Sequence, residues 1–157
     1  MGAPAQILRY CPRCPGPAKS VLIWHPTGAG ACMAKILIVE DSPDNMKLFG
    51  TILGLKGHEV TGLPGGEGLL DAILQGTPDL VLMDIQLPGK DGFALLQEIR
   101  SSPGAGTRVI ALTAHAMTGD RERALGAGFD GYITKPIDIR NFPEQIQRAL
   151  RGETPDG

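Results

Sequence analysis

Four short apolar runs, each ending in polar residues, constrain the fold of this chain more than any other feature. They occupy residues 36–41, 80–84, 109–113 and 132–136. A continuous apolar run of this length is typical of a parallel strand that is buried on both faces. The carboxyl ends of such strands meet at one edge of an open sheet, where α/β proteins form their sites. The pattern therefore predicts an α/β domain with a polar site at that edge.

Helical patterns separate these runs, and strand and helix alternate five times from Lys35 onward. Ser42 and Pro43 are typical of an N-cap followed by proline in the first helical turn. Short connections and right-handed crossovers favour a flavodoxin-like, doubly wound, five-stranded parallel sheet of order 2-1-3-4-5 with five helices. Strands are expected at about residues 36–39, 58–61, 79–83, 108–112 and 131–133, and helices at about residues 42–56, 69–76, 92–101, 118–127 and 139–150.

Two finer expectations concern single apolar and polar positions. In the last helix, Ile139, Phe142, Ile146 and Leu150 follow one another at spacings of three and four, which predicts one apolar stripe against the sheet. His58 lies in the second strand, which the predicted order puts at an edge, so we expect it to be exposed and assign it no role.

Size and charge exclude several classes of function. A chain of 157 residues fits one domain with a normal core. A net charge of −2 provides no basic field for nucleic-acid phosphates. No apolar stretch approaches the roughly 20 residues that span a bilayer. We therefore expect a cytoplasmic protein that binds neither nucleic acid nor membrane.

The first 32 residues differ in composition from the rest, being rich in Pro, Gly, Ala and Cys. We interpret residues 1–32 as a flexible extension that need not be native, because Met33 immediately precedes the first strong strand. Cys11 and Cys14 resemble half of a zinc site, but their surroundings lack a second pair at regular spacing. The globular domain is expected at residues 33–152, followed by a short tail at 153–157.

Acidic residues should converge where the first and third strands lie side by side. Glu40 and Asp41 end the first apolar run, and Asp84 ends the third. Three neighbouring carboxylates repel one another, and a divalent cation relieves that repulsion. Hard oxygen ligands with room for water and phosphate suit Mg²⁺. The alternative, in which these acids only cap a helix or lie in solvated loops, explains each acid singly better than all three together.

The remaining polar ends complete a site for phosphoryl transfer. Asp84 directly follows a buried strand and is the best-placed carboxylate nucleophile for forming an acyl phosphate. Lys135 supplies a cation for phosphoryl oxygens, and Thr113 supplies a hydroxyl donor. A single lysine at a strand end is usually only solvated, and a single threonine there is usually only a β-forming residue. The acids, the threonine and the lysine taken together favour a site for phosphoryl transfer.

Four motifs stand in order at the predicted strand ends: Val39-Glu40-Asp41-Ser42, Leu82-Met83-Asp84-Ile85-Gln86-Leu87-Pro88, Ala111-Leu112-Thr113-Ala114-His115-Ala116-Met117 and Ile133-Thr134-Lys135-Pro136. With these motifs, residues 34–151 resemble the receiver domain of two-component response regulators. Residues 45–48 and 83–86 are similar to those of DivK-type single-domain regulators and of hybrid-kinase receivers.

The resemblance implies a specific use of these residues. Asp84 would accept a phosphoryl group from a histidine kinase or a histidine phosphotransfer protein. Asp41, Asp84 and the main-chain carbonyl of Gln86 would ligate Mg²⁺, with Glu40 helping through water. Thr113 and Lys135 would contact the phosphoryl oxygens, and no turnover of an external substrate is expected beyond possible autodephosphorylation.

The resemblance also implies how the signal is transmitted and timed. Tyr132 would be a switch aromatic that turns inward as Thr113 moves towards the phosphate, and Lys135-Pro136 would be a cis peptide. Gln86 and His115 would tune the lifetime of the phosphoryl group. Because only residues 152–157 follow the domain, we expect the output to be contact with a downstream protein at the surface of the fourth helix, fifth strand and fifth helix.

Three other functions fit the sequence less well. Haloacid-dehalogenase-like phosphatases need a second acid two positions after the nucleophile, where this chain has Gln86. A flavodoxin-like FMN site needs a phosphate-binding loop after the first strand, where this chain has Glu40 and Asp41. A pseudo-receiver that binds partners without phosphorylation remains as the alternative from another class, although the complete set of acids, threonine and lysine argues against it.

Overall fold

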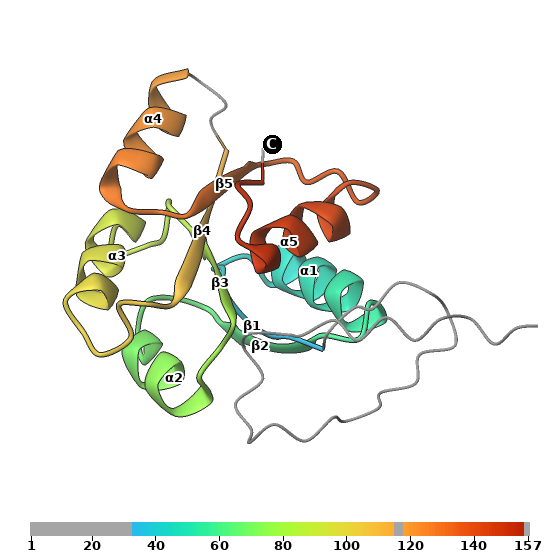
Figure 1. Cartoon of the computed structure of the whole chain (residues 1–157), viewed down its shortest axis with the longest axis horizontal. Coiled ribbons are helices and arrows are strands. Elements are labelled where there is room, and N and C mark those ends of the chain that lie inside the picture. Colours follow the sequence, from blue (N-terminus) through green and yellow to red (C-terminus); the bar gives the residue numbers. More distant parts are fainter. Residues whose placement is uncertain (1–32, 115–117, 156–157) are drawn as a thin grey trace, which may run out of the picture. The chain divides into compact units, whose positions relative to one another are not determined.

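The computed structural model describes residues 33–114 and 118–155, and these form a five-stranded parallel sheet flanked by helices (Figure 1). The strands lie in the order β2-β1-β3-β4-β5, which confirms the predicted doubly wound topology. The strands are β1 (Lys35–Val39), β2 (Glu59–Leu63), β3 (Leu80–Asp84), β4 (Arg108–Thr113) and β5 (Gly131–Thr134). The helices are α1 (Pro43–Leu55), α2 (Leu69–Gly76), α3 (Gly92–Arg100), α4 (Thr118–Ala127) and α5 (Phe142–Arg151).

Two hydrophobic layers sandwich the sheet, as the side-chain alternation of parallel strands requires. Ile36 and Ile38 of β1 pack in the layer beneath α1 and α5. Leu37 and Val39 point to the opposite layer, which α2, α3 and α4 cover. Figure 1 shows this division, with α1 and α5 on one side of the strands and the other three helices on the far side. Because the central strands are covered on both faces, their runs are apolar throughout.

Helix starts and stops follow the local signals in the sequence. The Ser42 side chain accepts a hydrogen bond of 3.4 Å from the main-chain N–H of Asn45, as an N-cap does. Asp91 caps α3 in the same way, accepting from the N–H of Phe93 at 3.1 Å. Gly152 ends α5 with a φ of 93°, a conformation that glycine adopts without strain. The caps at Ser42 and Asp91 fix the starts of α1 and α3 at the carboxyl edge.

Two finer sequence expectations are wrong. His58 is buried just before β2, not exposed on an edge strand, because its Nδ1 accepts a 3.3 Å hydrogen bond from the N–H of Ala34. Ile139 is 57% exposed and lies before α5, which begins at Phe142. The turn there is closed by Asp138, whose carbonyl oxygen accepts from the N–H of Phe142 at 2.8 Å. The apolar stripe therefore starts three residues later than its periodicity predicts.

The segment after α5 packs back onto the sheet. Pro155 is buried, and a Cβ added to Gly131 at the start of β5 would lie only 2.5 Å from its Cδ. The predicted tail is thus seated against β5 as far as residue 155. The predicted extension, residues 1–32, lies outside the described residues. Within the described part of the chain, no helix is both long and apolar enough to cross a membrane.

Candidate functional site

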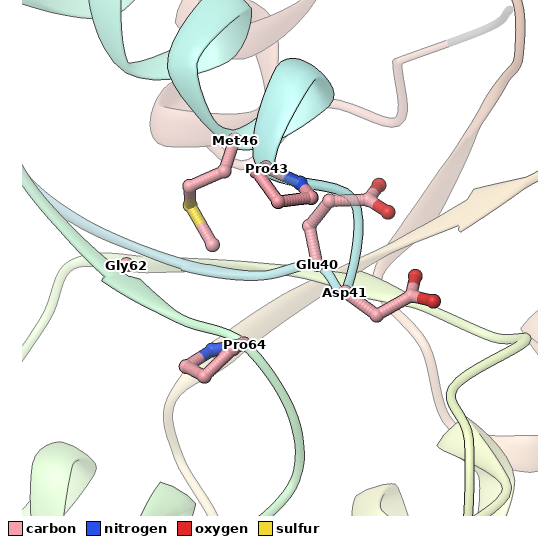
Figure 2. A pocket seen from close by; sticks show the side chains of 6 residues that line it. All are labelled: Glu40, Asp41, Pro43, Met46, Gly62 and Pro64. Atoms are coloured by element: carbon pink, nitrogen blue, oxygen red, sulfur yellow. The ribbon is translucent and has the colours of Figure 1, made fainter.

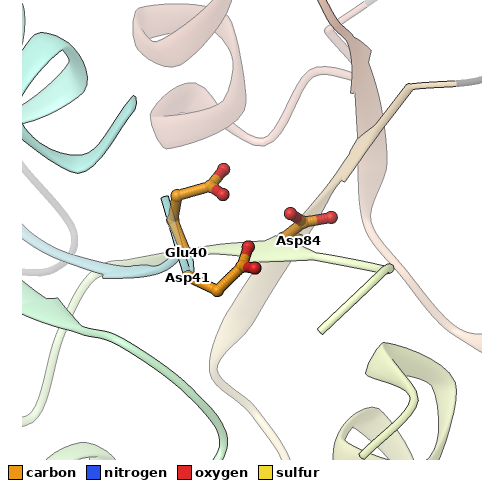
Figure 3. A group of neighbouring side chains, drawn as sticks. All are labelled: Glu40, Asp41 and Asp84. Carbon is orange, nitrogen blue, oxygen red and sulfur yellow. The ribbon is translucent and has the colours of Figure 1, made fainter. Parts of the chain in front are cut away.

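Three acidic side chains meet at the carboxyl edge of the sheet, as the sequence predicts. Glu40 and Asp41 follow β1, and Asp84 ends the neighbouring β3 (Figure 3). One carboxylate oxygen from each lies within 4.8 Å of the others. Glu40 is only 2% and Asp84 5% exposed, whereas Asp41 is exposed to solvent. A ligand arriving from solvent therefore meets Asp41 first and the two buried acids behind it.

Lys135 from the loop after β5 bridges the two buried acids. Its Nζ lies 2.5 Å from Oε2 of Glu40 and 2.9 Å from Oδ2 of Asp84. The loop is held to the sheet because the N–H of Lys135 donates to the carbonyl oxygen of Thr113 at 2.7 Å. The predicted cis peptide bond between Lys135 and Pro136 is present. The sheet therefore brings together residues that are up to 95 positions apart in the sequence.

Main-chain donors fix the remaining carboxylate oxygens. The N–H of Gln86 donates to Oδ1 of Asp84 at 2.9 Å, and the N–H of Ser42 donates to Oε1 of Glu40 at 3.2 Å. Charge-assisted hydrogen bonds of this kind orient an anion and are stronger than neutral ones. Each buried acid is therefore held by one ammonium and one amide, in a geometry that the loops after β1 and β3 determine.

Electrostatics at the site reflect a shortage of positive charge. Burial raises the pKa of the Glu40 carboxyl, although hydrogen bonds from Lys135 and Ser42 act in the opposite direction. Burial by itself lowers the pKa of the Lys135 ammonium, but its bonds to Glu40 and Asp84 outweigh that effect and the pKa is raised. The two shifts agree physically, because one ammonium serves two buried carboxylates and cannot neutralise both.

Of the other predicted site residues, Thr113 and Gln86 lie at the same edge, whereas Tyr132 lies within β5, where it pairs with Ala111 of β4. Thr113 is the last residue of β4 and is buried. Gln86 is exposed in the loop after β3, and Tyr132 is half-buried on β5 with the Arg121 guanidinium 5.6 Å from its ring centroid. His115 lies outside the described residues.

A small pocket adjoins the acids on the side away from their carboxylates. It has a volume of about 230 Å³ and lies between the start of α1 and the end of β2. Figure 2 shows the Met46 side chain running over Gly62, while the carboxylates of Glu40 and Asp41 point the other way. A Cβ on Gly62 would lie 2.5 Å from the Met46 sulfur. The Met46 side chain therefore occupies space that a side chain at position 62 would need. The lining residues are Glu40, Asp41, Pro43, Met46, Gly62 and Pro64.

The donor set fits a hard divalent cation. All three side chains of the cluster offer carboxylate oxygens, and the cluster contains neither cysteine nor histidine. Oxygen ligands with an open, solvent-facing side suit Mg²⁺, whereas zinc prefers sulfur and nitrogen. Burial of two acids beside a third also creates an excess of negative charge that a cation would relieve.

Sequence reasoning missed one residue that shapes the site. Gly92, the first residue of α3, is buried against the main chain that follows Asp84. Its only sequence signal was the pair Asp91-Gly92 at a helix start, which a helix cap alone explains. The close approach depends on how α3 lies over the loop, which no local pattern encodes.

Comparisons with known proteins agree with this geometry. Residues 36–147 match the family model described as the response regulator receiver domain. The chain is 40% identical over 121 residues to the polar-differentiation response regulator DivK of Brucella ovis, covering 73% of this chain and 94% of DivK. It is 37% identical over 130 residues to the sensor protein GacS of Pseudomonas syringae pv. syringae, covering 78% of this chain but only 14% of GacS.

A solved structure has the same fold. The receiver domain of the sensor histidine kinase PA1611 from Pseudomonas aeruginosa PAO1 superimposes with a TM-score of 0.69 at 35% identity. The match covers 76% of this chain and 99% of that domain. In that crystal structure a magnesium ion is coordinated in the active site cleft.

Proposed function

The chain belongs to the response regulator receiver domain family of two-component signalling, and on that premise we propose that it accepts a phosphoryl group on Asp84. One observation carries the proposal: Asp84 lies buried beside two other carboxylates, with one oxygen hydrogen-bonded to the Lys135 ammonium and the other to a main-chain N–H. A carboxylate oriented by two donors beside a cation site is suited to nucleophilic attack on phosphorus.

The proposed reaction transfers a phosphoryl group from a histidine of the donor protein to Asp84. An Asp84 oxygen forms a bond to phosphorus while the bond from phosphorus to the donor's imidazole nitrogen breaks. The electron pair of that bond stays on the nitrogen, which then takes up a proton. Lys135 and Thr113 hold the phosphoryl oxygens after transfer.

We assign the cation site to Asp41, Asp84 and the main-chain carbonyl of Gln86, with Glu40 contributing through water. Bound there, Mg²⁺ would shield the charge of the incoming phosphoryl oxygens. Exposure supports Asp41 as a direct ligand, because its carboxylate faces solvent. The Glu40 oxygens are already engaged by Lys135 and Ser42, which supports a less direct role.

Receiver domains interact with histidine kinases or with phosphotransfer proteins, and we propose such a donor for this chain in the cytoplasm. The match to nearly the whole of the response regulator DivK supports a role as a response regulator. The proposed output surface is α4, β5 and α5, because Thr113 leads towards α4 while Tyr132 and Lys135 bracket the end of β5.

The test is labelling with acetyl phosphate. We expect the protein to be labelled in Mg²⁺ and not in EDTA, and we expect Asp84→Asn to abolish labelling because the nucleophile is lost. Asp71→Asn, at an exposed position on α2, is the matched control and should label normally. Labelling of Asp84→Asn would overturn the assignment. Absence of labelling in the unaltered protein, with a partner still bound, would favour the pseudo-receiver.

A further inference from the structure

Gly92 approaches the main chain after Asp84 more closely than a side chain permits. A Cβ at this position would lie 2.8 Å from Cα of Ile85, 2.9 Å from the carbonyl oxygen of Asp84 and 3.2 Å from the carbonyl oxygen of Ile85. The Gly92 N–H also donates to the carbonyl oxygen of Ile85 at 3.0 Å. All the clashing atoms belong to the main chain, so no rotamer change would relieve them.

Both sides of this contact, the first turn of α3 and the main chain at Ile85, are held in place by the rest of the domain. On one side, Leu95, Leu96 and Ile99 of α3 are fully buried in the core. On the other side, the N–H of Ile85 donates to the carbonyl oxygen of Leu112 on β4 at 3.0 Å. The next residue, Gln86, is exposed, and its N–H donates to Oδ1 of Asp84 at 2.9 Å. A displacement at Ile85 would therefore be passed on to Gln86.

We propose that Gly92 is a positioning residue for the cation and phosphoryl site. By lacking a side chain, it lets the first turn of α3 brace the main chain of Ile85 and Gln86. That brace sets the Gln86 N–H on Asp84 Oδ1 and the Gln86 carbonyl beside the acid cluster. The inference rests on the proposed function, because the Gln86 carbonyl matters only if the cluster holds a cation.

The chain offers a matched control for a glycine that is merely tightly packed. Gly104, in the loop before β4, is also buried, and a Cβ there would lie 2.7 Å from Cγ2 of Ile73. That loop lies at the amino end of β4, away from the carboxyl edge that carries the site. Gly104→Ala should therefore disturb packing without disturbing the loop after β3.

The experiment compares Gly92→Ala and Gly104→Ala in the full chain by titrating Mg²⁺ and following amide shifts of Asp41 and Gln86. We expect Gly92→Ala to weaken Mg²⁺ binding by about tenfold or more, as changes behind a metal ligand do. Gly104→Ala should bind Mg²⁺ as the unaltered protein does, even where both variants lose similar thermal stability. Equal Mg²⁺ affinity of Gly92→Ala and the unaltered protein would overturn the inference while leaving the proposed function intact.

A measurement on the unaltered protein covers the case in which Gly92→Ala does not fold. The Gly92 and Gln86 amide shifts should follow the same Mg²⁺ titration curve, while Gly104 stays unmoved. A Gln86 response without a Gly92 response would overturn the inference. If no amide responds to Mg²⁺, the cation site itself fails, and this inference fails with it.

Discussion

At the residue scale, Lys135 provides the positive charge that pairs with two buried carboxylates. Glu40 and Asp84 are both almost fully buried, and one ammonium contacts both. A buried carboxylate without a partner is strongly destabilising, so the lysine stabilises the site before any phosphate arrives. The sequence predicts Lys135 as a phosphoryl contact, and the structure adds this second role.

A second residue-scale feature is His58, whose burial predicts a pH dependence of stability. Burial lowers the pKa of the His58 imidazole below 6.5, and protonation of Nδ1 would break the hydrogen bond from Ala34. Below about pH 6.5 the unfolded chain therefore binds a proton that the folded chain resists. This contribution to stability is complete above that pH and is lost as the pH falls towards the folded pKa.

We expect His58→Gln to reduce the loss of stability between pH 7.5 and pH 5.5, measured by urea unfolding at each pH. Other groups titrate in both proteins, so the difference between the two pH profiles is the quantity to compare. Parallel profiles would show that His58 does not carry the effect.

At the element scale, Arg100 ties three segments together at the amino edge of the sheet. Its guanidinium donates to the carbonyl oxygens of Ala105 and Thr107 before β4 and of Gly128 after α4. It also forms an ion pair of 2.9 Å with Asp130, which accepts from the N–H of Val109 as well. The end of α4 is thereby anchored to α3 and β4.

Arg100→Met should lower the free energy of unfolding by about 2 to 4 kcal/mol, because several charge-assisted hydrogen bonds are lost together. Lys90→Met removes the exposed ion pair between Lys90, in the loop before α3, and Glu98 on α3, and it should cost about 1 kcal/mol or less. Chemical denaturation of both variants provides the comparison, and equal losses would contradict the role of Arg100.

A further element-scale prediction concerns α4, β5 and α5 as a signalling surface. Thr113 is buried at the end of β4, from which the chain continues to α4. To reverse a two-state equilibrium fully, phosphorylation must stabilise the active state over the inactive state by about 5 kcal/mol. Contacts of Thr113 and Lys135 with a phosphoryl group, at about 1.5 to 3 kcal/mol each, are of the right size.

Thr113→Ala should still accept phosphate on Asp84 but transmit the change poorly. With beryllofluoride bound, amide shifts of residues 119–125 and 131–142 should move in the unaltered protein and move much less in Thr113→Ala. A response confined to residues near Asp84 in the unaltered protein would exclude this output surface.

At the scale of the whole molecule, the two hydrophobic layers seen in the described residues run from Ala34 to Leu150 and cover both faces of the sheet. A chain starting at Met33 should therefore unfold cooperatively and accept phosphate as the full chain does. Thermal unfolding and acetyl phosphate labelling of both chains test this expectation. Loss of cooperativity, or stoichiometric zinc in the full-length protein, would give the first 32 residues a structural role.

The sequence by itself determined the fold class, the strand order and the members of the acidic site. Buried parallel strands need continuous apolar runs, and the polar residue that ends each run must lie at the carboxyl edge. Glu40, Asp41, Asp84, Thr113 and Lys135 could therefore be selected from local pattern alone. Ile139 shows the limit of periodicity, since its spacing fits the stripe of α5 while the turn at Asp138 leaves it exposed.

Only the tertiary structure decided which groups pair and which glycine packs against the main chain after Asp84. The bridge from Lys135 to Glu40 and Asp84, the burial of His58 and the seating of Pro155 on Gly131 all join residues distant in sequence. The contact of Gly92 with the main chain of Ile85 spans few residues, yet it depends on how the buried face of α3 settles on the sheet. Packing across layers sets such distances, and a one-dimensional pattern carries no record of them.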